Sequence, residues 1–129
     1  MLMNTTAVRN PDLNEENSTG EKIVFAILRG ILPPHTDNEK AAEYLRNDIG
    51  QSDSIIEWTA VRPDGLIDLG ETTEYTVYQT LQVSPIFNSW KTSRINVANF
   101  MAKLITNDET WIKWKGQMPV IYNKEHEKK

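Results

Sequence analysis

Residues 55–69, IIEWTAVRPDGLIDL, indicate a buried strand that ends in a turn. The first half of this stretch is apolar, β-branched and aromatic, which is typical of a strand covered on both faces. Pro63 offers no N–H to a ladder and Gly65 tolerates a positive φ, so we expect the chain to leave the sheet between Arg62 and Gly65. Ligands of open α/β sheets sit at the carboxyl ends of strands, which makes this turn the first place to look for a site.

The composition is typical of one globular domain. The chain has 129 residues, of which 39% are hydrophobic and 25% charged, and its net charge is −4. An acidic chain without a basic face argues against nucleic acid as a partner. The sequence has no cysteine and two histidines, one of them in a charged tail, so no metal constellation is expected. No apolar run reaches the roughly 20 residues of a membrane span, and a cytoplasmic location is the default.

Two helices are predicted in the first half of the chain. Ser18 and Glu21 form a capping-box pattern, and Pro33-Pro34 are expected to end the helix that this pattern opens. The apolar positions of that helix recur at helical spacing and are Ile23, Val24, Ile27, Leu28, Ile31 and Leu32. Thr36 opens a second capping box, whose helix ends before Gly50.

The second half of the chain continues the alternation of helices and strands. Residues 74–80 alternate well enough for a strand in a peripheral extension, and residues 118–122 indicate a final strand. Ser93 or Asn96 caps a helix between them, and Asp108 caps a shorter helix. The core positions expected of the first of these helices are Val97, Phe100, Met101, Leu104 and Ile105, and the shorter helix carries Trp111, Ile112 and Trp114.

Three segments carry a resemblance to a known family. The helix segment AAEYLRNDIG (41–50) leads into the strand segment EWTAVRPDGL (57–66), and TSRINVA (92–98) follows. Their order and spacing resemble the short-chain dehydrogenase/reductase superfamily, in particular its atypical NAD(P)H-binding or NmrA-like branch. For residues 1–123 the resemblance implies the C-terminal half of a doubly wound, mainly parallel Rossmann-type α/β sheet with flanking helices and a C-terminal helical cap. Residues 124–129 are expected to form a disordered charged tail.

In that family the strand at Leu2 to Ala7 is the fifth of the sheet, and a glycine-rich phosphate loop precedes it. No G-x-G-x-x-G pattern occurs in this sequence. The resemblance therefore implies a truncated fragment whose first strand lacks a neighbour. Because an unprotected apolar sheet edge favours pairing, we expect the chain to dimerise through Leu2–Ala7, to pair with another chain, or to be only marginally stable.

The resemblance also implies NADP or NAD as the cofactor, with a small-molecule substrate. The family places a Ser or Thr at the end of the fifth strand, where it can hydrogen-bond the substrate carbonyl or the nicotinamide. Its backbone approaches the nicotinamide carboxamide just beyond the next strand. The positions that match are Asn4, Thr5, Thr6, Arg62, Pro63 and Asp64, with Thr5 also a catalytic candidate. Two other interpretations remain open, namely strand-end polarity for the threonines and an ion pair for Arg62.

Classical members of the superfamily carry a Tyr-x-x-x-Lys pair on the helix before the second of these strands, where the Lys lowers the Tyr pKa. In this chain the two positions hold His35 and Glu39, within HTDNE. Histidine is the side chain whose unperturbed pKa lies near neutrality, so His35 is a candidate catalytic proton shuttle, which Asp37 could orient. The alternative is a loop in which Thr36 or Asp37 only caps a helix.

Three functions follow from the resemblance. The first is an NAD(P)H-binding oxidoreductase that transfers a hydride to a flavin, quinone or carbonyl acceptor. The second is a non-catalytic NmrA-like protein that senses dinucleotides or binds a partner, which the replacement of Tyr-x-x-x-Lys favours. In the third, the fragment has no activity of its own, because the phosphate loop lies outside this sequence.

Overall fold

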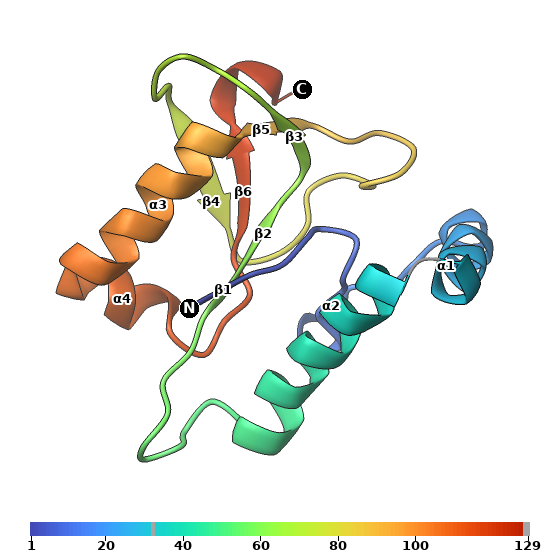
Figure 1. The fold of residues 1–129 in the computed structure, drawn as a ribbon, viewed down its shortest axis with the longest axis horizontal. Coiled ribbons are helices and arrows are strands. Elements are labelled where there is room, and N and C mark those ends of the chain that lie inside the picture. The colour runs from blue at the N-terminus through green and yellow to red at the C-terminus, as the bar shows by residue number, and fades with distance from the viewer. Residues whose placement is uncertain (32, 128–129) are drawn as a thin grey trace.

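A computed structural model describes residues 1–31 and 33–127 of the chain. The expectations for Leu32 and for residues 128–129 of the tail lie outside the described residues. The fold is α/β, as predicted, with a four-stranded sheet in the order β1-β2-β6-β4 and helices on both sides of it (Figure 1). The strands are β1 (Leu2–Met3), β2 (Ala60–Pro63), β3 (Gly65–Ile67), β4 (Tyr75–Tyr78), β5 (Lys91–Ser93) and β6 (Val120–Asn123). The helices are α1 (Thr19–Ile31), α2 (Pro33–Glu43) with a π-helical turn at Tyr44–Ile49, α3 (Arg94–Thr106) and α4 (Asp108–Trp114), with short 3₁₀ turns at Pro11–Leu13 and Lys124–His126.

The main sheet is mostly parallel. Strands β1, β2 and β6 run parallel, and β4 pairs antiparallel with β6 at one edge. The prediction that residues 74–80 form a peripheral extension is therefore wrong, because β4 is part of the main sheet. Strand β1 forms the opposite edge, and its ladder to β2 continues from Leu2 N–H to Thr6 N–H, which donates to the Pro63 carbonyl at 3.2 Å.

The buried strand begins later than the apolar residues at 55–62 predict. Strand β2 begins at Ala60, and the side chain of Ile55 is 88% exposed. The carboxylate of Asp53 accepts the N–H groups of Ile55 and Ile56 at 2.8 and 2.7 Å, which holds them in a turn before the strand. Apolar composition alone therefore misplaced the start of the strand.

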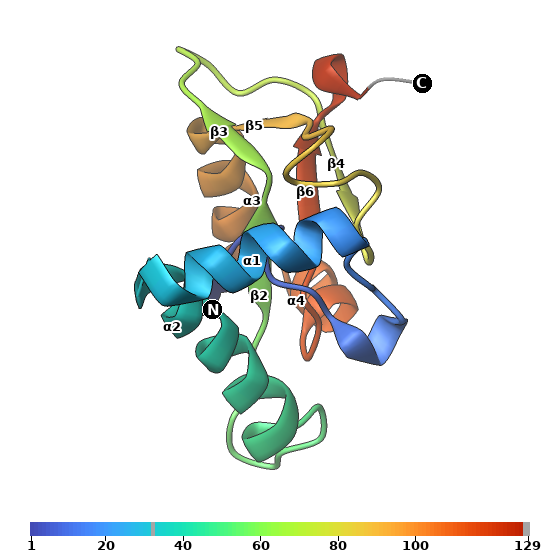
Figure 2. The same ribbon diagram turned by 90° about the vertical axis from the view of Figure 1, so that its right-hand side faces the viewer.

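The chain leaves the main sheet between Arg62 and Gly65, as predicted, but it does so without a turn and passes directly into a second sheet. Strand β3 follows β2 after one residue and pairs in parallel with β5 (Figure 2). The hydroxyl of Thr92 lies at the junction, accepting from Asp64 N–H at 3.2 Å and donating to the Ile121 carbonyl at 2.5 Å. One side chain thus replaces the next ladder bond between β2 and β6, and the two strands separate there.

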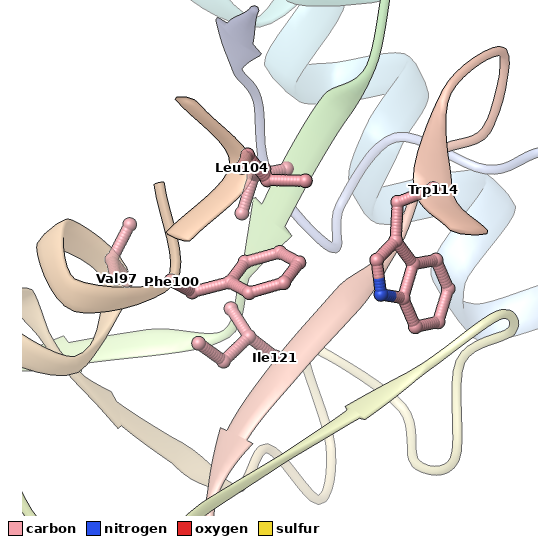
Figure 3. Packing of buried hydrophobic residues seen from close by; sticks show 6 residues of the cluster. Val97, Phe100, Leu104, Trp114 and Ile121 are labelled. Carbon is pink, nitrogen blue, oxygen red and sulfur yellow. The ribbon is translucent and has the colours of Figure 1, made fainter. Parts of the chain in front are cut away.

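The two faces of the sheet bury separate apolar clusters. On one face, side chains of α3 and α4 pack against those of β2 and β6. The buried residues of this cluster are Val61, Val97, Phe100, Leu104, Trp114 and Ile121 (Figure 3). The rings of Phe100 and Trp114 meet edge to face with centroids 6.3 Å apart. On the other face, α2 and its π-helical turn cover Val8, Ala42, Trp58, Ala60 and Met118. Because neighbouring side chains of a strand point to opposite faces, Ala60 and Val61 contribute to different clusters.

The helix ends follow local sequence signals in part. The capping box of Ser18 and Glu21 is present, with each backbone N–H donating to the other side chain at 3.2 Å. Gly50 has φ 73° and ends the π-helical turn. Pro33, however, is the first residue of α2, so Thr36 lies within this helix and the second capping box is wrong. Proline suits the first turn of a helix, where its missing N–H has no partner to lose.

Several smaller expectations need correction. Ser93 caps α3 as one of the two predicted alternatives, but Asn107 rather than Asp108 caps α4. Ile105 is a predicted core position, yet its side chain is 73% exposed. The predicted disordered tail begins with the 3₁₀ turn Lys124–His126.

In the part of the chain that the structure describes, no helix has both the length and the apolar character needed to cross a membrane.

Candidate functional site

A cleft of about 340 Å³ opens where β1 and β2 end. Residues 4–7 and 63–66 line it from the two strand ends. This is the position at which open α/β sheets bind ligands, and the separation of β2 from β6 beside it leaves room at the sheet edge. The cleft therefore contains five of the six predicted cofactor-binding positions, which are Asn4, Thr5, Thr6, Pro63 and Asp64.

The polar side of the cleft is built from the ends of β1 and β2. The Thr6 hydroxyl donates to Asp64 Oδ1 at 3.1 Å and so connects the two strand ends. Asn4 Nδ2 donates to the Asn38 carbonyl of α2 at 3.2 Å, while its Oδ1 accepts from Thr5 N–H at 2.9 Å. These contacts fix the polar groups in place before any ligand enters.

Asp64 is the central carboxylate of the cleft. Besides Thr6, it accepts the backbone N–H of Trp90 at 2.9 Å through Oδ2. Burial raises the pKa of Asp64, and the hydrogen bonds from Thr6, Gly65 and Trp90 do not offset that rise. A carboxyl of this kind can both accept and donate a hydrogen bond near its raised pKa.

Apolar side chains complete the cleft. Phe25 and Leu28 of α1 line it, together with Pro85 and Ile86 from the connection between β4 and β5. We call this connection, residues 79–90, the strap; Figure 2 shows it beside the beginning of α1. The cleft thus combines a polar edge at the strand ends with apolar walls, an arrangement that suits a flat ring with polar substituents.

The side chain of Arg62 does not line the cleft. It is fully buried and pairs with Glu15 through two contacts of 2.7 and 3.0 Å, and its other donors reach the carbonyls of Val8 and Met118. Burial raises the pKa of Glu15, but the hydrogen bond and charge of Arg62, with backbone donors from Asn10 and Leu81, outweigh burial and leave that pKa lowered. Of the two interpretations for Arg62, the structure supports the ion pair.

His35 lies outside the cleft, behind one of its walls. Its ring stacks on Phe25 with centroids 5.2 Å apart and an interplanar angle of 7°. Its Nε2 is 2.5 Å from Glu39 Oε1, although the direction of this contact is not that of a hydrogen bond. Neither Thr36 nor Asp37 caps a helix, because both lie within α2. His35 therefore touches a lining residue without reaching the cleft itself.

Sequence reasoning missed the residues that shape the walls. Glu15 accepts from Leu81 N–H at 3.0 Å, and Glu21 accepts from the Ser84 hydroxyl at 3.1 Å. Glu21 was recognised only as part of a capping box, and the strap was read as irregular. The acidic residues of the 9–20 loop offered a weak signal, but nothing in their spacing indicates partners more than 60 residues away.

The fold is that of a Rossmann-type α/β protein, and the candidate cleft lies at the ends of its parallel strands. A model of the NAD(P)H-binding family matches residues 3–108, so the chain belongs to that family. This confirms the resemblance at family level, including NADP or NAD as the family's cofactor. No curated protein matches the chain.

One solved structure shares the fold. It is a short-chain dehydrogenase/reductase of the wide type from Veillonella parvula, determined in complex with NADP. The TM-score is 0.52 and the identity 15%, over 82% of this chain and 43% of that chain. At this identity the likeness shows the fold alone, and the chain spans less than half the length of this neighbour.

The residues present fit one end of a dinucleotide. In the register of the β1–β2 ladder, the backbone N–H of residue 63 would donate to the Asn4 carbonyl. Residue 63 is a proline and has no N–H, so β2 offers this carbonyl no donor at the mouth of the cleft. With the Thr6–Asp64 pair, this edge suits a carboxamide, which needs both acceptors and donors. A pyrophosphate group has no matching loop in this sequence, and within residues 1–31 and 33–127 no acidic or histidine cluster could hold a metal ion.

Proposed function

We propose that the cleft holds the nicotinamide end of NADP or NAD, and that the chain forms the nicotinamide and acceptor half of an NAD(P)H-dependent oxidoreductase. The Thr6–Asp64 hydrogen bond across the ends of β1 and β2, next to an apolar wall, is the observation that carries this proposal. The acceptor class is a flavin, quinone or carbonyl compound. The whole protein is of the NmrA-like, atypical kind and is cytoplasmic in this proposal.

Each part of the cleft has a separate task. Asn4, Thr6 and Asp64 bind and orient the carboxamide, and Thr5 lies at the edge where a substrate oxygen would enter. Phe25 and Leu28 exclude water from the ring face. A bound NAD(P)H supplies reducing equivalents, and the protein supplies position and a dry surface.

A non-catalytic, dinucleotide-sensing protein is the second candidate. The observation that favours it is the position of His35, which stacks behind Phe25 and does not line the cleft. If the protein is an enzyme, Phe25 separates His35 from the cleft, so a proton from His35 needs a path around this ring. Otherwise the acceptor takes its proton from water. A protein that binds NADPH but reduces neither menadione nor riboflavin is the result that supports the second candidate.

The test is a titration of the purified chain with NADPH, NADH and reduced nicotinamide mononucleotide, followed by tryptophan fluorescence. Thr6→Val removes the hydroxyl that bonds Asp64 and should weaken mononucleotide binding about tenfold. Thr59→Val is the matched control, since Thr59 is also a buried threonine whose hydroxyl donates to one acceptor, the Gln117 carbonyl at 3.2 Å. Equal binding by the two variants, or no saturable binding up to millimolar mononucleotide, contradicts the proposal.

Pairing through the edge of β1 belongs to the same proposal. Met1 and Met3 at this edge are 45% and 51% exposed, and β1 is the last strand of the sheet on that side. An open strand edge with exposed apolar side chains favours association with a second copy or another chain. Light scattering on the titration sample should show a dimer or larger species, and a monodisperse monomer with a high melting temperature contradicts it.

A further inference from the structure

The ends of the strap are fixed by buried carboxylates. At its start, Leu81 N–H donates to Glu15 at 3.0 Å, and Glu15 is itself paired with the buried Arg62. At its end, Trp90 N–H donates to Asp64 at 2.9 Å. Both acceptors belong to other parts of the chain, so the strap is tied to the body of the protein at two points that are hard to release.

The middle of the strap is held differently. The Ser84 hydroxyl donates to Glu21 Oε2 at 3.1 Å and accepts the N–H groups of Ile86 and Phe87 at 3.4 and 3.2 Å. Phe87 packs over Gly20 so closely that a Cβ atom at Gly20 would lie 3.2 Å from the ring. The Ser84–Glu21 hydrogen bond and the packing of Phe87 over Gly20 therefore connect the middle of the strap to α1.

This connection joins two walls of the cleft. Ser84 directly precedes Pro85 and Ile86, which form the strap wall. Glu21 lies one helical turn before Phe25, which forms the α1 wall together with Leu28. Because residues four apart lie on the same side of a helix, the carboxylate of Glu21 sets the distance between the two walls.

We propose that the Glu21–Ser84 hydrogen bond is a latch that fixes the width of the apolar half of the cleft and thereby selects the acceptor. Closed, the cleft favours a flat two-ring quinone; open, it admits the larger three-ring system of a flavin. Glu21 and Ser84 are positioning residues, because they act through Pro85 and Ile86. The inference rests on the proposed function for its ligand, but the movement of the strap can be measured without one.

The first experiment measures hydrogen exchange in the free protein. Glu21→Ala removes the carboxylate that holds the Ser84 hydroxyl in place. This hydroxyl is the acceptor for the Ile86 and Phe87 N–H groups, so their hydrogen bonds weaken when it is no longer held, and faster exchange at these two amides reports opening of the strap. We expect about a tenfold increase there, with Leu81 and Trp90 within twofold of wild type. Ser18→Ala is the control, since it removes the other half of the capping box and keeps the carboxylate of Glu21.

Glu21→Gln separates the latch from a general loss of stability. The amide keeps an oxygen that can accept from Ser84, although it loses the charge that pairs with Arg9. Restored protection at Ile86 and Phe87 in this variant, at a similar melting temperature to Glu21→Ala, supports the latch. Uniformly faster exchange over the whole strap in Glu21→Ala, or unchanged exchange, overturns it.

The second experiment measures selectivity. Menadione, riboflavin and reduced nicotinamide mononucleotide are titrated into the wild type, Glu21→Ala and Ser18→Ala. We expect the ratio of the dissociation constants for menadione and riboflavin to shift at least fivefold toward riboflavin in Glu21→Ala alone, with the mononucleotide within twofold. If Glu21→Ala cannot be purified, Ser84→Ala removes the contact from the strap side and should shift the same ratio.

The outcomes distinguish the two proposals. An unchanged ratio in a variant whose strap has opened, and which still binds the mononucleotide, overturns the latch. A wild type that binds none of the three compounds overturns the proposed function, and exchange at Ile86 and Phe87 then still decides whether Glu21 holds the strap.

Discussion

The Arg62–Glu15 ion pair should be among the most sensitive points of the fold. The side chains of Arg62 and Glu15 are 0% and 5% exposed, and Glu15 also accepts the N–H groups of Asn10 and Leu81. Glu15→Ala leaves a buried guanidinium without its partner, which costs about 3 to 5 kcal/mol of unfolding free energy. For a domain of this size, that loss corresponds to a melting temperature roughly 10 to 15 °C lower.

The assay is urea unfolding followed by tryptophan fluorescence, with thermal unfolding by circular dichroism. Glu16→Ala is the control, because the neighbouring carboxylate is exposed and should matter by less than about 0.5 kcal/mol. The double variant Glu15→Leu, Arg62→Met should be more stable than Glu15→Ala, since no buried charge remains. A loss below about 1 kcal/mol in Glu15→Ala, or a double variant less stable than the single one, refutes this account of the pair.

The pH dependence of the same pair has a defined sign. Because the folded-state pKa of Glu15 is lowered, its contribution is fully present above the unfolded value near 4.5 and is lost as pH falls through the lowered folded value. The wild type should therefore lose its advantage over Glu15→Gln on acidification within that window. An advantage that stays constant from neutral pH to about pH 2 contradicts the assignment.

Three further predictions concern the cleft and the sheet. The folded-state pKa of Asp64 is raised, so the wild type loses stability as pH rises from the unfolded-state pKa near 3.8 through the raised folded-state pKa. Asp64→Asn should therefore gain stability relative to the wild type over that pH range, measured by urea unfolding. Thr92→Val leaves the Asp64 N–H and the Ile121 carbonyl without the bridging hydroxyl, and should lower the unfolding free energy by roughly 2 to 4 kcal/mol. Urea unfolding measures this loss, with Thr72→Val at an exposed site as the control. Burial raises the pKa of Tyr122 to about 12, so the tyrosine that titrates last in ultraviolet absorbance should be Tyr122, and this last step should disappear in Tyr122→Phe.

Local signals in the sequence predicted local structure well. The capping box at Ser18, the positive φ of Gly50 and the cap at Ser93 depend on backbone geometry within a few residues, and all three are present. The mainly parallel α/β architecture came from the family resemblance rather than from these signals. Local chemistry and resemblance together gave the order of the main elements.

Apolar pattern was a weaker guide to burial. In α1 the buried apolar residue is Phe25, whereas Ile23, Ile27 and Ile31 are more than half exposed. A helix with apolar residues around most of its surface does not reveal which side faces the protein. Pro33-Pro34 had a similar ambiguity, since proline both ends a preceding helix and suits the first turn of a new one.

The candidate site was located by its strand ends, but its walls were not. Asn4, Thr5, Thr6, Pro63 and Asp64 came together because parallel strands end at the same sheet edge. The contacts of Glu15 and Glu21 with the strap span more than 60 residues and depend on how the strap crosses the sheet. Spacing in a single sequence carries no information about such contacts.

The most direct test of the central claim is a map of backbone amide shifts in a ¹⁵N-labelled sample titrated with reduced nicotinamide mononucleotide. We predict saturable shifts at Thr5, Thr6, Asp64 and Gly65, with smaller ones in the strap, and none in β4 beyond the noise. Shifts centred on another surface, for example the exposed groove around Thr72 to Thr76, or no shifts at millimolar mononucleotide, would contradict a nicotinamide site at the ends of β1 and β2.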